Sequence, residues 1–135
     1  MGRGLERDLS IAYLDTQVAI WLHAGALENL TGEANRQIES NDLLISPMAF
    51  LEFQYLLERK RIGKDPLAIY TYLQVRFGVN LCSFPFAAIA TEALSCTWTR
   101  DPFDRIIVSH AKVNGEAVLI TADRKIRQNY SGARW

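Results

Sequence analysis

Short apolar runs of strand length alternate along this chain with longer segments of helical periodicity. The apolar runs span residues 10–15, 43–46, 79–84 and 117–121, and the closing residues 133–135 could add an edge strand. Strands separated by helices form a parallel sheet, because each helical crossover returns the chain to the same end of the sheet. The sequence therefore predicts an α/β fold with a central parallel sheet of four to five strands.

The helical segments carry recognisable end signals. Asp65-Pro66 and Asp101-Pro102 each place an N-cap residue before a proline at the first helical position. Gly63 and Gly78 are expected to end the two helices before them, because glycine readily adopts the left-handed conformation found there. With their caps, the predicted helices span residues 16–27, 31–40, 47–63, 65–78, 85–94, 101–115 and 123–129.

Composition and charge indicate an ordinary globular chain. Of 135 residues, 49% are hydrophobic and 22% charged, and the formal net charge is zero, which does not indicate a strongly basic nucleic-acid binder. We expect a single domain over residues 1–135. No apolar run approaches the roughly 20 residues of a membrane span, and the N-terminus lacks an apolar signal core. We therefore expect no membrane partner, a cytoplasmic location and free thiols at Cys82 and Cys96.

Four acidic residues occupy places where a carboxylate needs an explanation. Asp15 and Asp123 follow apolar strand segments, Glu52 lies in an apolar helix, and Asp104 lies in the helical turn after Asp101. The carboxyl ends of parallel strands meet at one edge of the sheet, so we expect these four side chains to converge there. Two such charges about 4 Å apart repel by roughly 4 kcal/mol at an effective dielectric near 20. Protons or a bound cation can remove this cost, which predicts a divalent metal site.

Each acid also has a structural interpretation. Asp15 and Asp123 could cap the helices that follow them, and Asp104 would be favourable in the first turn of a helix in any case. Glu52 is harder to explain in this way, because large apolar residues flank it. We interpret Asp101 as a helix cap first and as an accessory residue of the acidic site second.

Four blocks of sequence carry these acids: Tyr13-Leu-Asp-Thr16, Ser46-Pro-Met-Ala-Phe-Leu-Glu52, Arg100-Asp-Pro-Phe-Asp-Arg-Ile-Ile-Val-Ser-His-Ala111 and Leu119-Ile-Thr-Ala-Asp-Arg-Lys-Ile126. Each block is weak alone, but together, in this order and spacing, they resemble the PIN-domain ribonucleases, and among them the small VapC-type toxins of toxin–antitoxin pairs. The resemblance spans nearly the whole chain. It implies a PIN-like three-layer α/β/α fold with helices on both faces of the sheet.

The resemblance implies that Asp15, Glu52, Asp104 and Asp123 bind one or two Mg²⁺ or Mn²⁺ ions and that water, activated by the metal, hydrolyses RNA. Asp15 and Asp104 are the first candidates for direct ligands, and the sequence does not separate direct from water-mediated binding for the other two. The hydroxyl groups of Thr16 and Thr121 could orient a carboxylate or a water molecule, or could serve in turns and helix caps. The accessory candidates are Thr16, Asp101, Arg105 and Thr121.

Basic and aromatic residues give weaker indications of substrate contact. Trp98, in the loop before Asp101, and Arg124, after Asp123, are the candidate substrate-binding residues. We interpret Arg59-Lys60-Arg61 as a solvated helix surface. Tyr55 is expected in the core or in a subunit contact, in preference to stacking on an RNA base. The RNA target cannot be inferred, because no base-reading motif is present.

The family resemblance also implies partners, namely a cognate antitoxin that keeps the toxin inactive and a second copy in a homodimer. Two other functions stay open. A degenerate PIN module could bind RNA or protein without catalysis, although the presence of all four acids speaks against it. A Mg²⁺-dependent receiver-type phosphoacceptor domain requires an acidic pair after the first strand, and Leu14 and Thr16 flank Asp15 instead.

Overall fold

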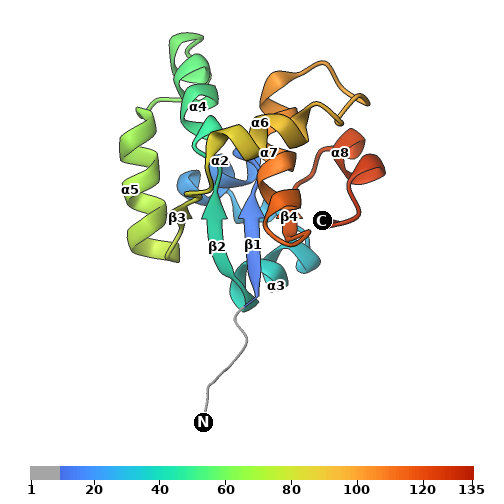
Figure 1. The fold of residues 1–135 in the computed structure, drawn as a ribbon. Coiled ribbons are helices and arrows are strands. Elements are labelled where there is room, and N and C mark those ends of the chain that lie inside the picture. Colours follow the sequence, from blue (N-terminus) through green and yellow to red (C-terminus); the bar gives the residue numbers. More distant parts are fainter. Residues whose placement is uncertain (1–9) are drawn as a thin grey trace.

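The computed structural model describes residues 10–135, which form a five-stranded parallel sheet covered by helices (Figure 1). The spatial order of the strands is β3-β2-β1-β4-β5, and every neighbouring pair is parallel. β1 lies in the middle, where Tyr13 is in register with Leu44 on one side and Leu119 on the other. The strands are β1 (Ile11–Leu14), β2 (Asp42–Ile45), β3 (Asn80–Leu81), β4 (Val118–Ile120) and β5 (Ala133–Arg134).

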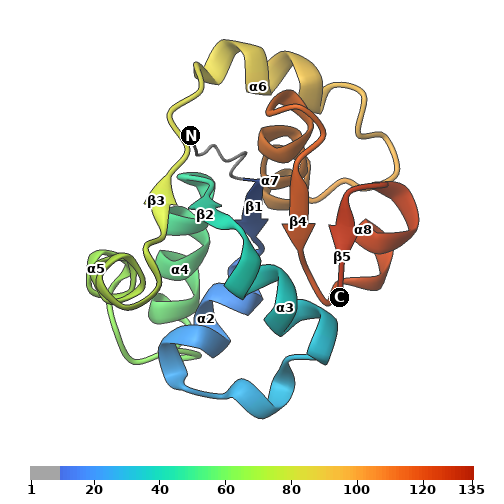
Figure 2. The ribbon, with the colours of Figure 1, turned by 90° about the horizontal axis from the view of Figure 1, so that it is seen from below.

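Helices cover both faces of this sheet. Figure 2 shows α2, α3, α4 and α5 on one side and α6 and α7 on the other, with α8 beside β5. The predicted three-layer α/β/α fold is therefore confirmed. The helices are α2 (Thr16–Ala24), a 3-10 turn η1 (Leu27–Asn29), α3 (Gly32–Ser40), α4 (Met48–Glu58), α5 (Pro66–Phe77), α6 (Phe86–Ala93), α7 (Pro102–Val113) and α8 (Arg124–Asn129).

The central strand anchors the helices of both layers. Ala12 and Leu14 face one hydrophobic cluster, which includes Phe53 of α4, whereas Tyr13 faces the other cluster with Ile107 of α7. This division follows from the alternation of side chains along a strand. All five side chains are buried, and burial of a large apolar side chain stabilises the fold by about 1.5–3 kcal/mol. The residue that follows β1 is consequently held in a fixed position.

The predicted helix starts at Thr31 and Asp65 are confirmed by hydrogen bonds from backbone N–H groups to the cap side chains. Thr31 accepts from Ala34 N at 3.0 Å, and Asp65 accepts from Ala68 N at 3.0 Å. Pro66 then occupies the first turn of α5, and Gly78, with φ at 69°, ends that helix as predicted. Local chemistry thus explains these boundaries.

Three predicted boundaries are wrong. The helix expected over 16–27 ends at Ala24, because Gly25 turns the chain with φ at 72°. The helix expected to continue to Gly63 ends at Glu58, where Lys60 adopts the left-handed conformation with φ at 60°. Two hydrogen bonds close this end, from the N–H of Lys60 and of Arg61 to carbonyls of the last helical turn, so Lys60 occupies the position usual for glycine.

The third wrong boundary is the strand expected over 79–84, which pairs only at Asn80–Leu81. β3 lies at the edge of the sheet, and its partner β2 ends at Ile45. One further hydrogen bond, from Cys82 N to Ile45 O at 2.9 Å, is the last contact of the ladder. Beyond it no residue of β2 remains to pair with, and Pro85 has no N–H to donate.

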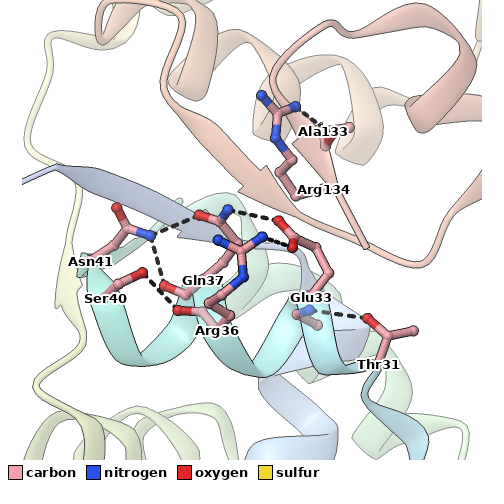
Figure 3. A network of polar contacts seen from close by, with 9 residues as sticks. Thr31, Glu33, Arg36, Gln37, Ser40, Asn41, Ala133 and Arg134 are labelled. Carbon is pink, nitrogen blue, oxygen red and sulfur yellow. Dashed lines mark hydrogen bonds and ion pairs between the residues drawn. The ribbon is translucent and has the colours of Figure 1, made fainter.

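The outer surface of α3 carries a polar network away from the carboxyl ends of the strands (Figures 1 and 3). Glu33 pairs with Arg36 and accepts a hydrogen bond from Gln37 at 2.8 Å, while Asn41 donates to the Gln37 carbonyl at 2.7 Å. Arg134 of β5 donates to backbone carbonyls of its own segment. This is a solvated helix surface. Within residues 10–135, no helix has the length and apolar character needed to cross a membrane.

Candidate functional site

An open pocket at the carboxyl ends of β1 and β4 is lined by five acidic residues. Its volume is about 400 Å³. The structure brings together all four acids singled out from the sequence, and it adds the accessory candidate Asp101. The acidic lining consists of Asp15, Glu52, Asp101, Asp104 and Asp123, and the other lining residues are Thr16, Gln17, Ile20, Leu56 and Ala122.

Three of the five carboxylates are fixed at helix starts. Asp15 follows β1 and accepts from Thr16 N at 2.8 Å, and Asp123 follows β4 and accepts from Ile126 N at 3.0 Å. Asp101 accepts from Phe103 N at 2.8 Å at the start of α7. The capping interpretation of these three residues is therefore confirmed, and capping places the same side chains at the pocket. A helix N-terminus also favours a nearby negative charge.

Asp15 is the most buried of these carboxylates, with 9% of its surface exposed. Its second oxygen, Oδ2, accepts a hydrogen bond from the hydroxyl of Thr121 at 2.6 Å. The Thr121 hydroxyl in turn accepts from Asp123 N at 3.0 Å, so this buried threonine links the segments that follow β1 and β4. Both oxygens of Asp15 are consequently fixed in direction.

Glu52 is oriented by the second predicted hydroxyl. Thr16 Oγ1 donates to Glu52 Oε1 at 2.5 Å, and the side chain of Thr16 is itself buried. Thr16 also begins α2 directly after Asp15, so the end of β1 and the helix α4 are joined through one residue. Thr16 shows the orientation of a carboxylate, and Thr121 shows both this use and a turn hydrogen bond from Asp123 N.

The crowding of negative charge changes the protonation of the site. Burial, followed by the charges of Asp101, Asp15, Asp123 and Glu52, raises the pKa of Asp104 from 3.8 to about 7. Burial also raises the pKa of Asp15, although its hydrogen bonds from Thr121 and Thr16 oppose this rise. The pKa of Glu52 is raised by burial and by the charges of Asp15 and Asp101, against the hydrogen bond from Thr16. Cations or protons are therefore favoured in the pocket.

The donor set suits a hard divalent cation, because carboxylate oxygens are the preferred protein ligands of Mg²⁺ and Mn²⁺. Among the described residues, no lysine, arginine or histidine forms an ion pair with these acids. In the same part of the chain, no three acidic, histidine or cysteine side chains are already closed around a position that could hold a metal. The residues thus fit the ion in charge and chemistry, and binding requires the carboxylates to close around it.

Three further residues predicted for the site lie in other surroundings. Arg105 Nε donates to Thr99 O at 2.9 Å and its NH1 donates to Ala93 O at 3.3 Å, so its guanidinium holds the loop before α7. Trp98 packs against the cluster around Tyr13. Arg124 is exposed at the start of α8 and is absent from the lining of the acidic pocket. Their accessory and substrate-binding roles stay predictions.

Four residues that line the pocket were not predicted from the sequence, namely Gln17, Ile20, Leu56 and Ala122. Gln17 is exposed in the first turn of α2, and Leu56 lies one helical turn after Glu52 on α4. The i, i+4 spacing of Leu56 from Glu52 was a usable signal, because such residues share one face of a helix. Gln17 carried no comparable signal, since glutamine is common on exposed helix surfaces.

A comparison with known families decides the affiliation of the chain. The model of the PIN domain matches residues 12–131. The chain belongs to the PIN domain family. The match spans all four sequence blocks that carry the acids, and the family resemblance inferred from them is confirmed. No curated protein matches the sequence of this PIN domain.

Solved structures agree with this fold. VapBC2 from Rickettsia felis, bound to a DNA fragment from the promoter, matches with a TM-score of 0.61 and 19% identity over 93% of this chain and 98% of that one. DNA-bound VapBC from Salmonella typhimurium matches with a TM-score of 0.53 and 22% identity over 94% of this chain and 96% of that one. VapBC-1 from nontypeable Haemophilus influenzae matches with a TM-score of 0.54 and 21% identity over 93% of this chain and 96% of that one. At these identities the likeness concerns the fold.

Proposed function

We propose that this PIN domain is a metal-dependent endoribonuclease and the VapC-type toxin of a toxin–antitoxin pair. The observation that carries the proposal is the pocket lined by five carboxylates, in which the pKa of Asp104 is raised to about 7. Proteins of this family are generally nucleases that depend on a divalent metal. A pocket that collects negative charge and excludes basic side chains is suited to a cation through which an anionic RNA backbone can bind.

Asp15 and Asp104 are proposed as direct ligands of Mg²⁺ or Mn²⁺, with Glu52 and Asp123 as direct or water-mediated ligands of one or two ions. When bound, such an ion supplies Lewis acidity toward water and the scissile phosphate. Thr121 holds the carboxylate of Asp15 in its direction. The pocket residues supply no activated serine or cysteine, so hydrolysis by water is the proposed reaction.

The remaining polar residues of the pocket act on those ligands. Thr16 orients Glu52, and the raised pKa of Asp104 allows this residue to hold a proton near neutral pH in the absence of metal. Asp101 caps α7 and adds negative charge to the lining of the pocket. We propose that these residues tune the affinity for the ion.

A cognate antitoxin is the proposed protein partner. The solved structures similar in fold are VapBC assemblies, two of them bound to DNA. An arginine of an inhibitory partner would suit the acidic pocket, because a guanidinium pairs with carboxylates in a bidentate geometry. The homodimer, the cytoplasmic location and the extent of a single domain over residues 1–135 stay predictions.

A non-catalytic PIN module that binds RNA or protein is the second candidate function. The open acidic pocket is compatible with it, since the presence of carboxylates does not by itself establish turnover. The receiver-type alternative lacks support, because the family assignment and the absence of an acidic pair after β1 both speak against it.

The test is cleavage of structured and single-stranded RNAs in Mg²⁺, Mn²⁺ or EDTA by the antitoxin-free protein. Asp15→Asn removes one charge from the pocket, and Asp42→Asn is the matched control, because Asp42 is an exposed aspartate at the opposite end of the sheet. We expect cleavage that EDTA abolishes, that Asp15→Asn loses and that Asp42→Asn retains.

Equal cleavage by the wild type and Asp15→Asn would refute the assignment of the site. Absence of cleavage by the wild type, with Mg²⁺ binding confirmed by calorimetry, would favour the binding module. Circular dichroism spectra of all three proteins establish that the substitutions leave the fold intact.

A further inference from the structure

A second pocket lies beside the acidic pocket and is continuous with it. Both pockets are lined by Glu52, Leu56 and Asp101, and the second has a volume of about 390 Å³. Its remaining lining differs in character, because it is aromatic and basic. These residues are Tyr55, Arg59, Pro102 and Phe103.

The aromatic wall of this pocket presents an exposed ring. Tyr55 is 43% exposed, although tyrosine and phenylalanine side chains contribute most to stability when buried. Its ring meets that of Phe103 edge to face, with 5.5 Å between centroids and 88° between planes. This contact fixes the orientation of both rings without covering Tyr55. A rigid, partly exposed aromatic surface is suited to stacking with a planar group.

The residues of α4 that line the two pockets form one stripe along the helix. Glu52, Tyr55, Leu56 and Arg59 are spaced i, i+3, i+4 and i+7, which places them on a single face. The stripe leads from a carboxylate at the acidic pocket to an aromatic ring and then to a cation. At 1.5 Å per residue it extends about 10 Å along the helix axis.

Arg59 has its charge available for a ligand. It is exposed at the end of α4, and within residues 10–135 no carboxylate forms an ion pair with it. The cationic side chains of a partner tail suit the carboxylates of the acidic pocket, whereas the second pocket would set them beside the like charge of Arg59. An RNA strand has the opposite requirement, because its phosphates are negative and its bases are planar.

We propose that the second pocket is a substrate subsite in which an unpaired base next to the scissile phosphate stacks on Tyr55 while Arg59 binds a neighbouring phosphate. This inference rests on the proposed nuclease function, and it requires the base next to the scissile phosphate to be unpaired. Bases inside an A-form duplex are stacked on each other and cannot lie on a protein ring. Tyr55 and Arg59 are positioning residues for the strand, and neither takes part in the bond-breaking step.

The test compares binding and cleavage by variants of this pocket. Binding of a fluorescein-labelled single strand of roughly ten nucleotides is followed by anisotropy in Ca²⁺, with a gel to confirm that the strand stays intact. A duplex of the same sequence is the second probe. The pocket variants are Tyr55→Ala, Tyr55→Phe and Arg59→Gln. The matched controls are Phe86→Ala and Arg76→Gln, since both residues are exposed and neither lines the two pockets.

We expect Tyr55→Ala to raise Kd for the single strand roughly 5- to 30-fold, in line with the loss of one stacked base, and to raise KM for cleavage with kcat nearly unchanged. Tyr55→Phe keeps the ring and should stay within about twofold of wild type. Arg59→Gln should reduce the slope of log affinity against log salt by about 0.7, as expected for one lost phosphate contact. The affinity of the Tyr55 variants for the duplex should not change. The affinity of the two control variants for the single strand should not change either.

Unchanged single-strand affinity in Tyr55→Ala would refute the subsite, as would equal losses for single strand and duplex or equal losses in Phe86→Ala. If the wild type cleaves RNA and Tyr55→Ala cleaves with the same KM, the subsite fails while the nuclease function stands. If the wild type binds with the expected pattern and does not cleave, the nuclease function fails and the subsite stands. Arg59→Gln keeps the test decisive if Tyr55→Ala does not fold.

Discussion

Replacement of Asp104 by asparagine should stabilise the metal-free protein at pH 8, although the residue belongs to the proposed site. In the folded protein the pKa of Asp104 is about 7, against an ordinary value of 3.8, because burial and the surrounding carboxylates disfavour its charge. The folded protein therefore binds more protons than the unfolded chain between these two values. The stability that this tighter proton binding contributes is fully present below pH 3.8 and is lost as the pH rises through 7.

The magnitude follows from this difference in pKa. A rise from 3.8 to about 7 corresponds to about 4 kcal/mol at 1.36 kcal/mol per pKa unit. Asp104 is only half-buried and lines an open pocket, so solvent screening reduces this value. We expect Asp104→Asn to raise the free energy of unfolding in EDTA by about 1–2 kcal/mol at pH 8 and by much less at pH 4.5.

Urea unfolding followed by circular dichroism measures this difference, with EDTA present and the pH varied from 4.5 to 8. Asp42→Asn is the matched control, since Asp42 is exposed and distant from the pocket. Addition of Mg²⁺ should make the wild type more stable than Asp104→Asn, because the wild type gains stability from the ion and the variant gains less. An Asp104→Asn protein that is no more stable than wild type at pH 8 in EDTA would show that the carboxylates do not repel each other as the structure indicates.

Three other substitutions test the framework of the site. Thr16→Val removes the hydroxyl that orients Glu52 and should lower the Mg²⁺ affinity measured by calorimetry about 10-fold, whereas Thr16→Ser should retain the wild-type affinity. Equal affinities of the wild type and Thr16→Val would refute this role. Thr121→Val leaves Oδ2 of Asp15 without its donor and should cost about 1–3 kcal/mol in urea unfolding, and a neutral result would contradict the importance of that hydrogen bond. Lys60→Gly should stabilise the protein by about 1 kcal/mol and leave cleavage unchanged, because glycine adopts the left-handed conformation without strain. A loss of stability in this variant would exclude strain at Lys60.

The sequence was informative wherever local chemistry decides the structure. Asp65-Pro66 and Asp101-Pro102 begin helices as predicted, because the cap oxygen and the proline act within one turn. It was least informative where a tertiary contact decides. The length of β3 depends on where its neighbour β2 ends. The end of α4 at Glu58 was missed for a local reason, because Lys60 takes the left-handed conformation that usually indicates a glycine.

The candidate site divides in the same way. Asp15 and Asp123 could be placed at one pocket because parallel strands end at a common edge. The hydrogen bonds of Thr16 and Thr121 could not be predicted, since they join residues 36 and 106 positions apart. Arg105 was predicted as an accessory residue of the site. Its guanidinium instead bonds carbonyls of the preceding loop, whose path cannot be inferred from sequence.

The same side chains serve the fold and the proposed chemistry, and this links stability to metal binding. Asp15, Asp101 and Asp123 satisfy N–H groups at the starts of three helices, which anchors them at the pocket. Glu52 and Asp104 lie within helices that pack on one another, so they are brought toward the caps by the core. Packing thus forces like charges together at a cost to the free protein. A bound cation removes that cost, so the proposed metal should stabilise this domain in addition to its role in the proposed hydrolysis.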